Sequence, residues 1–572
     1  MHETAARRWV EVACDAAAAA RLARELSLEP IAARVLASRG LADPADAERF
    51  LAARLADLPD PFLLRGMEAA VARLLAALAA GERIALYGDY DVDGVTSTAL
   101  LAGFLRAAGA DVVTYVPHRL VEGYGLNTAA VKRLAEGGAR LLVSLDCGIT
   151  SVAEVRAAAE LGVDTVVVDH HTVPVELPAA TAILNPHQPG CAYPYKQLAA
   201  VGVTFCLAMA LRRRLREAGK FGAARPEPNL REALDLVALG TVADVVPLTG
   251  VNRVLVRWGL EELARTRRVG LAALKRVAGI APGAVTAGQV GFRLGPRINA
   301  AGRLDDAGRG VRLLLESDPT RAAALADELD RENRSRQEIE REILEQALAQ
   351  AEERVRGGAR GLVLSSERWH PGVIGIVASR VVERFHRPAV LVGVADGVGK
   401  GSGRSIEAFH LYDALDACAG HLTRFGGHKH AAGITIDPAR IAAFREAFEG
   451  IASARLGDDD LVPRCRIEGR VDAADLCERA ALALEGLAPW GAGHPEPLFA
   501  LRARPGRART VGATGAHLKL TLGAGLDAIG FGLGDRLAAC EGEVEAAVSL
   551  GFDEWDGRRR LQLRIKDLRQ AA

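Results

Sequence analysis

The sequence lacks several features that mark other classes of protein. No apolar run approaches the roughly 20 residues that a membrane-spanning helix needs, so we expect no membrane partner. The 8 cysteines show no C-x-x-C spacing, which argues against both a zinc ribbon and a disulfide scaffold. The first residues form no apolar core followed by a cleavage site, and their acidic residues fit poorly with a transit peptide. We therefore expect a cytoplasmic protein.

The sequence also lacks a net charge, because 72 Lys and Arg residues balance 72 Asp and Glu residues. The net charge therefore gives no indication of nucleic-acid binding, and any such binding would need a basic patch confined to part of the surface. Hydrophobic residues make up 49% of the chain and charged residues 25%, which is ordinary for a folded protein. With 572 residues, the chain exceeds the size of one hydrophobic core, so we expect several domains.

Short apolar runs alternate with helical patterns after an N-terminal helical segment, which we place at residues 1–66. The runs are apolar on both faces: RIALY (83–87), DVVTYV (111–116), RLLVSL (140–145) and DTVVVD (164–169). Such runs, separated by helices, predict a buried parallel sheet with βαβ crossovers. We expect this α/β domain to occupy residues 67–316.

The second half of the chain predicts three further parts. A long connecting helix is expected at 317–357, and its middle, residues 330–338, contains no apolar side chain. We expect that stretch to be exposed all round, bridging two lobes with a groove between them. A smaller α/β domain is predicted at 358–455, and short alternating runs after it predict a small antiparallel β-barrel at 460–572. The predicted fold class is therefore multidomain α/β.

The strongest chemical signal is GDYDVDGVTST (88–98), where a predicted strand ends and a helix begins. Asp89, Asp91 and Asp93 are expected at the C-terminal edge of the sheet, where open α/β folds bind their ligands. Carboxylates so close together repel one another unless cations neutralise them. The pattern D-x-D-x-D-G also begins an EF-hand loop, but the twelfth position holds Leu100 instead of Glu, and a strand precedes it.

Three more segments add acidic and imidazole side chains. LLVSLDCGIT places Asp146 after an apolar run, and TVVVDHHT does the same for Asp169, His170 and His171. LGTVADVVPL contributes Asp244 from an otherwise apolar segment, where an unpaired carboxylate is costly to bury. This set of ligands suits Mn²⁺, Mg²⁺ or Zn²⁺, and paired hard cations are a recurrent device for phosphoester hydrolysis.

In this order, the segments DYDVDG, SLDCGIT, DHH and GTVADVVPL resemble the four motifs of the DHH superfamily of phosphoesterases. The resemblance implies that two Mn²⁺ or Mg²⁺ ions are bound by Asp91, Asp93, Asp146, His170 and Asp244, with Asp89 as a further ligand or a neighbour. It also implies that Asp146 contacts both ions, that His171 contacts the phosphate, and that Asp169 anchors the histidine pair. The predicted catalytic residues are Asp91, Asp93, Asp146, His170, His171 and Asp244.

Glycine-rich basic segments are candidates for holding phosphate, although each alone is typical of a turn with a solvated charge. GSGRS (401–405) and GGHKHAAG (426–433) together resemble the DHH-associated domain of the superfamily. PHRLVEGYGLN (117–127) resembles a segment of the RecJ family near the metals, and RLGPRINAAGR (293–303) is a further basic segment. The predicted substrate contacts are Arg119, Arg297, Asn299, Ser402, Arg404 and His428.

The C-terminal barrel carries basic strands, which suit a single-stranded backbone but equally suit protected sheet edges. PWGAGHPEPLF followed by the barrel pattern resembles the oligonucleotide-binding (OB) domain of the RecJ family, with Trp490 and His494 where Phe and Asn are usual. The resemblance implies a 5′ to 3′ exonuclease that releases mononucleotides from single-stranded DNA in repair and recombination. It further implies a helicase and a single-strand-binding protein as partners, and we expect a monomer.

Three other functions fit parts of the sequence. A DHH phosphoesterase acting on short oligoribonucleotides, a nucleoside bisphosphate or cyclic dinucleotides needs no barrel and no long helix. A catalytically inert single-strand-binding module would not need intact metal motifs. A pyrophosphatase has a compact substrate, which again leaves the barrel without a role.

Overall fold

The computed structural model describes residues 7–119, 122–304, 306–523, 525–555 and 558–571, and its chain forms two compact units. The core unit comprises Ala52–Ser335 and Ala488–Pro495. The flanking unit comprises Met1–Leu51, Arg336–Leu487 and Glu496–Ala572. This division cuts across the predicted segments 1–66 and 317–357. None of the helices in the described ranges has the length and apolar character needed to cross a bilayer.

The core unit is built on a parallel sheet of five strands in the order β3-β2-β4-β5-β6. The strands are β2 (Arg83–Gly88), β3 (Asp111–Tyr115), β4 (Ala139–Leu145), β5 (Asp164–Val168) and β6 (Ala182–Leu184). The four predicted runs form the first four strands. The fifth strand escaped prediction because it has only 3 residues, too few to show a pattern.

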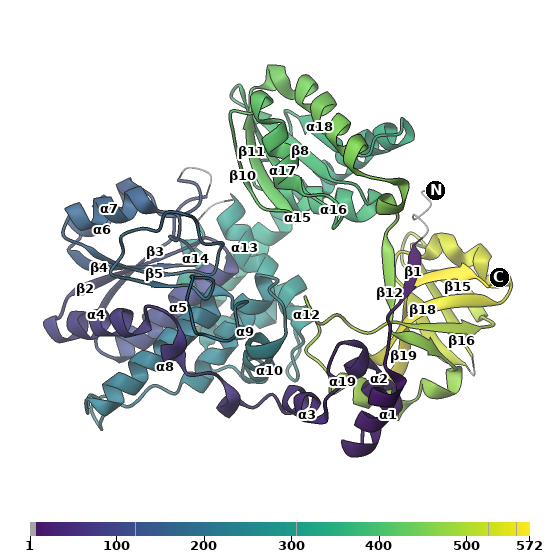
Figure 1. Cartoon of the computed structure of the whole chain (residues 1–572), viewed down its shortest axis with the longest axis horizontal. Helices are drawn as coiled ribbons and strands as arrows, with labels where there is room; N and C mark the ends of the chain where they lie inside the picture. The colour runs from purple at the N-terminus through teal and green to yellow at the C-terminus, as the bar shows by residue number, and fades with distance from the viewer. Residues whose placement is uncertain (1–6, 120–121, 305, 524, 556–557, 572) are drawn as a thin grey trace. The chain divides into compact units, whose positions relative to one another are not determined.

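Helices cover both faces of this sheet (Figure 1). Ile84 and Leu86 of β2 belong to one hydrophobic cluster with α4, α5 and α8, and Ala85 and Tyr87 belong to another with α6 and α7. The helices of the unit are α4 (Met67–Ala80), α5 (Val92–Ala107), α6 (Thr128–Glu136), α7 (Val152–Glu160), α8 (Ala200–Glu217), α9 (Leu234–Ala243), α10 (Gly250–Ala264), α11 (Val269–Val277), α12 (Ala287–Gln289), α13 (Gly295–Leu304) and α14 (Gly308–Leu315). Burial on both faces explains why the strands are continuously apolar.

The long helix α15 (Pro319–Arg356) contains 38 residues, and its polar middle is not exposed all round as expected. Asp330 is 5% and Asn333 2% exposed. Asp330 accepts a hydrogen bond of 2.9 Å from Arg297 Nε, and Glu332 pairs with Arg309. The prediction of a fully exposed stretch was wrong, because the charged side chains of this stretch pack on the protein through ion pairs with α13 and α14 instead of apolar contacts.

The flanking unit contains a five-stranded sheet in the order β10-β11-β9-β8-β7, in which only the β7–β8 pair is parallel within the described residues. Its elements are β7 (Leu362–Ser366), α16 (Ile374–Phe385), β8 (Ala389–Ala395), β9 (Val398–Arg404), α17 (Leu411–Ala417), β10 (Arg424–Gly427), β11 (Ala431–Ile436) and α18 (Ile441–Arg455). Val363 clusters with α17 and α18 on one face, whereas Leu364 clusters with α15 and α16 on the other. This is the predicted smaller α/β fold.

The C-terminal part of the flanking unit forms a seven-stranded sheet in the order β13-β14-β18-β19-β17-β16-β15. Its elements are β13 (Gly469–Val471), α19 (Glu478–Glu485), β14 (Phe499–Ala503), β15 (Gly506–Val511), β16 (His517–Leu522), β17 (Leu526–Gly530), β18 (Val544–Trp555) and β19 (Arg558–Gln570). The sheet is not purely antiparallel as predicted, because β13 runs parallel to β14 and β17 to β19.

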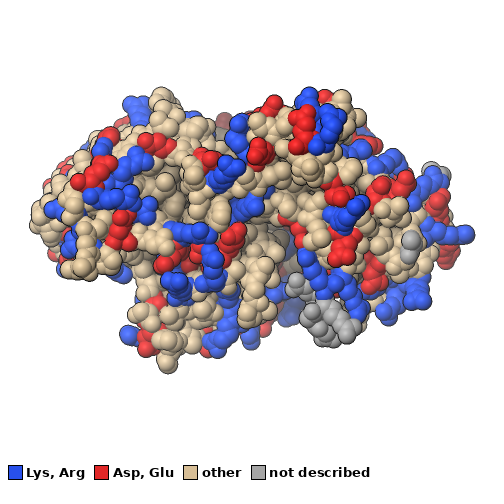
Figure 2. All heavy atoms as spheres, turned by 90° about the horizontal axis from the view of Figure 1, so that it is seen from below, with Lys and Arg blue, Asp and Glu red and all other residues tan. Residues whose placement is uncertain are grey.

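The N-terminal residues pack on this C-terminal part. Strand β1 (Arg8–Glu11) pairs in parallel with β12 (Arg464–Ile467), and Trp9 Nε1 donates a hydrogen bond of 2.7 Å to Asp567. The helices that follow are α1 (Ala16–Glu25), α2 (Pro30–Ser38) and α3 (Pro44–Ala52). On the face drawn in Figure 2, basic and acidic residues are interspersed, in keeping with the zero net charge.

Candidate metal centre

The loop between β2 and α5 holds three of the predicted ligands. Helix α5 begins at Val92, because Asp91 is its N-cap and accepts hydrogen bonds from Asp93 N (2.9 Å) and Gly94 N (3.1 Å). A Cβ atom at Gly94 would lie 2.4 Å from the carbonyl oxygen of Asp89. The turn that gathers the carboxylates therefore requires glycine at this position.

Asp93 connects this loop to helix α8. Its carboxylate is 1% exposed and accepts hydrogen bonds from Ala200 N (2.6 Å) and Val201 N (2.8 Å), in the first turn of α8. These amides have no partner within a helix, so the carboxylate satisfies them and meets the positive end of the helix dipole. The same contacts fix the direction in which Asp93 presents its remaining lone pairs.

Asp146 and Asp169 follow the neighbouring strands β4 and β5. Asp146 adopts a left-handed backbone conformation, with φ of 65°, at the point where the chain leaves the sheet. Asp169 accepts hydrogen bonds from Ile149 N (3.0 Å), His170 N (2.7 Å) and His171 Nδ1 (2.7 Å). Its oxygens are thus used to hold the loop and the two histidines.

His170 brings the carboxylates together. Its Nε2 atom lies 3.3 Å from Asp146 Oδ1, 3.6 Å from Asp244 Oδ2 and 3.9 Å from Asp93 Oδ2. Asp244 reaches this point from the C-terminal end of α9. Four segments that are distant in the sequence therefore meet at one edge of the sheet, as the sequence predicted.

The ligand atoms form groups of the size that one cation requires. Asp89, Asp91 and Asp146 offer oxygens within 4.8 Å of one another, and so do the ligand atoms of Asp93, His170 and Asp244. These two triads contain all six residues predicted to bind metal. A third group, Asp146, His170 and His171, overlaps both.

Four atoms of the cluster are buried and have no hydrogen-bond partner among the described residues. They are Asp89 Oδ1, Asp146 Oδ1, His170 Nε2 and Asp244 Oδ2. Leaving one buried polar group unsatisfied costs about 1–3 kcal/mol, and more when the group is charged. Carboxylate oxygens and an imidazole nitrogen that face one another without hydrogen-bond partners are suitable ligand atoms for hard divalent cations.

Electrostatics supports the same conclusion. Burial and the nearby Asp91 raise the pKa of Asp93 to about 7, and burial together with neighbouring carboxylates raises the pKa values of Asp89, Asp146 and Asp244 well above their usual range. Burial lowers the pKa of His170 to about 4, so its imidazole is neutral near pH 7. A neutral imidazole can ligate, whereas the carboxylates need a cation to be ionised together.

His171 lies beside the cluster and is half-exposed. Burial lowers its pKa, but the hydrogen bond and charge of Asp169 prevail, and the net shift is upward. Tyr124 donates a hydrogen bond to the carbonyl oxygen of Asp146 (3.3 Å), and its hydroxyl lies 3.2 Å from His171 Nδ1. Tyr90 lies between Asp89 and Asp91 in the sequence. The Arg119 guanidinium stacks over its ring, with Cζ 4.7 Å from the ring centroid. Two residues of the Arg119 segment, Leu120 and Val121, lie outside the described residues.

Comparison with known proteins shows the family. Three family models match: the N-terminal domain of the DHH family at residues 83–241, the DHHA1 domain at 358–454 and the RecJ OB domain at 467–567. The single-stranded-DNA-specific exonuclease RecJ of Dickeya dadantii (strain 3937) is 43% identical over 560 residues, which is 95% of this chain and 96% of that protein. The chain belongs to the RecJ family.

Solved structures of RecJ from Thermus thermophilus share the fold. The complex with Mn²⁺ is similar with a TM-score of 0.85 and 37% identity, over 99% of this chain and 80% of that one. The complex with Mg²⁺ is similar with a TM-score of 0.77 and 33% identity, over 99% and 79%. The predicted multidomain α/β fold with a C-terminal OB domain is thereby confirmed.

The remaining predicted contacts of this RecJ-family chain are divided between the two units. In the core unit, Asn299 Oδ1 accepts a hydrogen bond of 3.2 Å from Val92 N and so holds the start of α5, next to the loop that carries Asp89 and Asp91. The Arg297 guanidinium is used by Asp330 (2.9 Å), Arg293 O (2.6 Å) and Val277 O (3.4 Å), which favours a structural role. The structure does not bring either residue's side chain into the two triads.

Ser402, Arg404 and His428 lie in the flanking unit, within the region matched by the DHHA1 model. Arg404 Nη1 donates a hydrogen bond of 3.0 Å to Ser402 Oγ on β9. β11 pairs with β9, placing Ala431 opposite Arg404, and His428 N donates to Ala431 O (2.8 Å) in the turn before it. Ser402 and Arg404 thus lie on β9, and His428 lies in the turn between β10 and β11 of the same sheet. Their role toward phosphate stays a prediction.

Sequence reasoning missed two residues that contact the candidate ligands, and it assigned one segment of the core unit to the C-terminal barrel. Tyr124 lies in the segment quoted for Arg119, but a lone tyrosine gives no signal of its own. A Cβ atom at Gly240 of α9 would lie 2.3 Å from Thr96 Oγ1 and 3.1 Å from Asp93 Oδ1. The segment Ala488–Pro495 belongs to the core unit, where Leu248 N donates a hydrogen bond of 2.8 Å to Ala492 O, close in sequence to Asp244.

Proposed function

We propose that the protein is a divalent-cation-dependent exonuclease that hydrolyses single-stranded DNA. The observation that carries this proposal is the group of four buried, unsatisfied ligand atoms at the sheet edge of a RecJ-family chain. RecJ proteins of the family are single-stranded-DNA-specific exonucleases, and the Thermus protein is solved with Mn²⁺ and with Mg²⁺. The cofactors proposed here are two Mn²⁺ or Mg²⁺ ions.

The two triads are the proposed ligand sets. Asp89, Asp91 and Asp146 would hold one cation, and Asp93, His170 and Asp244 the other. Asp146 Oδ1 lies 3.3 Å from His170 Nε2, and this short distance supports the proposal that Asp146 contacts both cations. Bound together, two such cations supply Lewis-acid stabilisation of the negative charge on a phosphodiester undergoing attack by water.

The side chains around the cations orient the phosphate. Asp169 holds His171 Nδ1 at 2.7 Å, which fixes the ring and keeps a proton on that nitrogen. We propose that His171 donates to a phosphate oxygen, which its pKa, raised by Asp169 despite burial, supports. Arg119 contacts Tyr90 in the β2–α5 loop, which holds it near the carboxylates. We propose it as a second phosphate contact.

The finer features of the substrate are also proposals. Ser402, Arg404 and His428, in the region that the DHHA1 model matches, are proposed to bind a further phosphate of the strand. We also propose that the enzyme acts in the 5′ to 3′ direction and releases mononucleotides in DNA repair and recombination. Arg504, Arg507 and Arg509 are exposed on and before β15 of the OB domain, where they can follow a single-stranded backbone.

We propose further that the protein acts as a monomer in the cytoplasm, beside a helicase and a single-strand-binding protein. The 8 cysteines are free, which suits a reducing compartment. A nuclease confined to single strands needs a supply of unwound DNA and must compete with proteins that coat it. These points support the proposal and define the proteins to be tried in binding experiments.

The proposal is tested with a strand of several tens of nucleotides labelled at either its 5′ or its 3′ end, with Mn²⁺, and with the matching duplex as control. We expect the 5′ label to be released at once as a mononucleotide, the 3′ label to be released late, and the duplex to be spared. Activity limited to di- to pentanucleotides would instead assign a small-substrate phosphoesterase. Binding without hydrolysis by the Mn²⁺-loaded protein would assign an inert binding module.

A further inference from the structure

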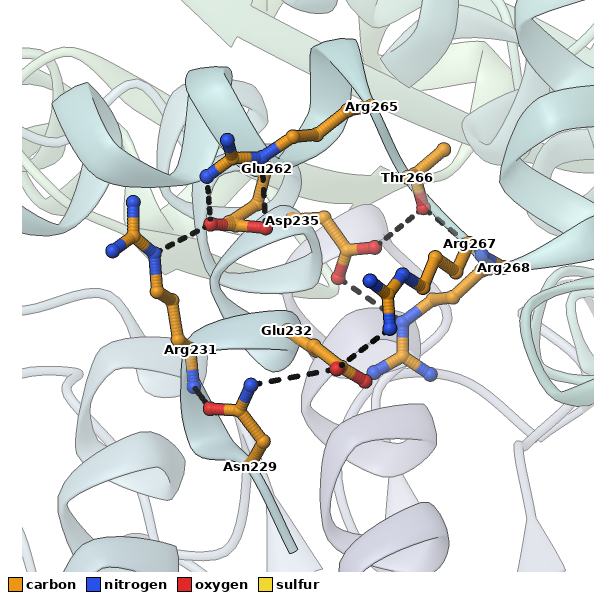
Figure 3. Close-up of a pocket in the computed structure, with 9 residues that line it drawn as sticks. All are labelled: Asn229, Arg231, Glu232, Asp235, Glu262, Arg265, Thr266, Arg267 and Arg268. Atoms are coloured by element: carbon orange, nitrogen blue, oxygen red, sulfur yellow. Dashed lines mark hydrogen bonds and ion pairs between the residues drawn. The ribbon is translucent and has the colours of Figure 1, made fainter.

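A pocket of about 480 Å³ lies in the core unit at the end of α9 remote from Asp244 (Figure 3). It is formed by the start of α9, the end of α10 and the connection to α11. Four arginines line it: Arg231, Arg265, Arg267 and Arg268. The nuclease function proposed above gives this pocket no role.

Arg268 is held in place by a buried carboxylate. Asp235 is 2% exposed, and it accepts hydrogen bonds from Arg268 Nε (3.0 Å) and from Thr266 Oγ1 (2.7 Å). Both terminal nitrogens of Arg268 have no hydrogen bond within the described ranges, and Figure 3 shows them directed away from Asp235. The result is a fixed guanidinium whose two terminal nitrogens can donate to a ligand.

The pocket carries more positive than negative side chains. Its four guanidinium groups face three carboxylates, those of Glu232, Asp235 and Glu262. Glu262 is shared, since it accepts from Arg231 Nε (2.6 Å) and from Arg265 Nη2 (2.7 Å). The side chain of Arg267 is 87% exposed, and its one ion pair with a described residue is a 3.5 Å contact with Glu232, so it can turn toward a ligand. An excess of guanidinium donors around one cavity suits a phosphate group, which they bind through paired hydrogen bonds.

Helix α9 connects the pocket to the metal centre. Asp235 lies in its first turn and Asp244 follows its last residue, so its 10 residues cover about 15 Å between the two sites. Between them, Gly240 packs against Thr96 and Asp93 so closely that no Cβ atom would fit. A shift of α9 at the pocket would therefore be transmitted to two ligands of the proposed centre.

We propose that this pocket binds a phosphate group and that its occupation changes the cation affinity of the metal centre through α9. The second part rests on the role proposed for Asp93 and Asp244. The phosphate has two possible sources, a free anion such as inorganic phosphate or a 5′-mononucleotide, and the backbone of the DNA strand. Their shared chemistry is the phosphate oxygen, and the experiment separates them.

Binding is measured by calorimetry on the full-length protein in EDTA, carrying Arg404→Gln so that the phosphate contact proposed in the flanking unit is removed. Inorganic phosphate, dAMP and a ten-nucleotide dT strand are titrated separately. We expect Arg268→Gln to weaken binding by about tenfold or more, the loss typical of a charged hydrogen-bond pair. Arg276→Gln, at the other end of α11, is the matched control and should change nothing.

Because Arg268→Gln leaves the buried Asp235 with fewer partners, Arg267→Gln serves as a second variant whose exposed side chain is not needed for folding. It should also weaken binding. Binding of phosphate and dAMP that is weakened by Arg268→Gln identifies a free anion as the source, and weakening of strand binding alone by Arg268→Gln identifies the DNA backbone. No binding of the three ligands, or equal binding by the Arg267, Arg268 and Arg276 variants, overturns the proposal.

The coupling is measured as the Mg²⁺ affinity with and without saturating phosphate. We expect a change of about fivefold or more in the parent protein and none in Arg268→Gln. An equal change in both proteins would mean that phosphate acts at the metal centre itself and would overturn the coupling. These readouts do not depend on nuclease activity, so they are distinct from a failure of the proposed function.

Discussion

Asp146 Oδ1 lies 3.3 Å from His170 Nε2, and neither buried atom has a hydrogen-bond partner among the described residues. Asp146 belongs to one ligand triad and His170 to the other, so this short distance is where the two triads meet. An ion pair between them is not the explanation, because burial lowers the pKa of His170 to about 4 and the ring is neutral near pH 7. Two cations sharing Asp146, as proposed above, would account for both unsatisfied atoms.

Asp169→Asn should lower kcat by roughly 10- to 100-fold, the loss typical of removing a group that orients a residue of a metal site. Asp169 raises the pKa of His171 against the effect of burial, so this pKa should also fall in the variant. Because His171 is proposed to act as a protonated donor, the alkaline limb of the pH profile should move to lower pH. Asp164→Asn, at the exposed start of β5, is the control. An unchanged pH profile would show that Asp169 only supports the fold.

The stability of the metal-free protein should fall as the pH rises from 6.5 to 8.5. A carboxyl group whose pKa is raised on folding stabilises the protein while it is protonated, and this contribution is lost as the pH passes its folded pKa, about 7 for Asp93. His170 acts in the opposite sense but only below about pH 6.5, because its folded pKa is lowered to about 4.

Divalent cations should remove this pH dependence, because they replace the protons on the carboxylates. At a concentration a hundred times its Kd, a cation stabilises the protein by about 2.7 kcal/mol, or roughly 5–10 °C in Tm. We expect the increase in Tm caused by Mg²⁺ to be larger at pH 8 than at pH 6.5, measured by differential scanning calorimetry. An increase that is equal at both pH values contradicts the proposed linkage.

Gly240→Ala should weaken cation binding, because its Cβ atom would lie 2.3 Å from Thr96 Oγ1 and 3.1 Å from Asp93 Oδ1. Overpacking of this kind costs about 1–3 kcal/mol, part of which is taken by displacing Asp93. Gly222→Ala, where nothing lies within 4 Å of the new atom, is the control. Calorimetric titration with Mn²⁺ checks the prediction, and equal affinities in the two variants would mean that α9 does not position Asp93.

Replacing Arg504, Arg507 and Arg509 with Gln should weaken binding of long single strands more than cleavage of short ones. Substitution is preferable to deletion of residues after 460, since β1 and Trp9 pack on that region. The slope of log K against log salt concentration should fall by about 0.7 for each lost phosphate contact. Arg502→Gln, whose guanidinium pairs with Glu543, is the control. Equal loss on long and short strands would assign a structural role.

The meeting of the candidate ligands was predictable, because most of them follow apolar runs and parallel strands place their carboxyl ends at one edge of the sheet. The signal for Asp244 was weaker, a carboxylate in an apolar segment, and the structure places it at the end of α9 rather than after a strand. Tyr124 and Gly240 were missed because their roles depend on atoms far away in the sequence. A hydroxyl that reaches Asp146 O leaves no pattern.

The polar middle of α15 shows why the exposed helix was predicted wrongly. The spacing of apolar residues predicts only which face of a helix packs through apolar contacts. Here the packing is polar: Asp330 pairs with Arg297, and Glu332 pairs with Arg309. The same pairing explains why Arg297, predicted to bind phosphate, is occupied within the protein. A basic residue in a glycine-rich segment has no sequence feature that tells a ligand contact from an internal ion pair.

The most direct test of the two-cation centre is the number of Mn²⁺ ions bound per chain, measured by calorimetry and by anomalous diffraction, in the parent protein and in Asp146→Asn. We predict two ions in the parent protein, one held by each triad. We predict fewer than two in the variant, with hydrolysis abolished and single-stranded DNA still bound. A single ion in the parent protein, or full hydrolysis by Asp146→Asn, would contradict the assignment of two cations that share Asp146.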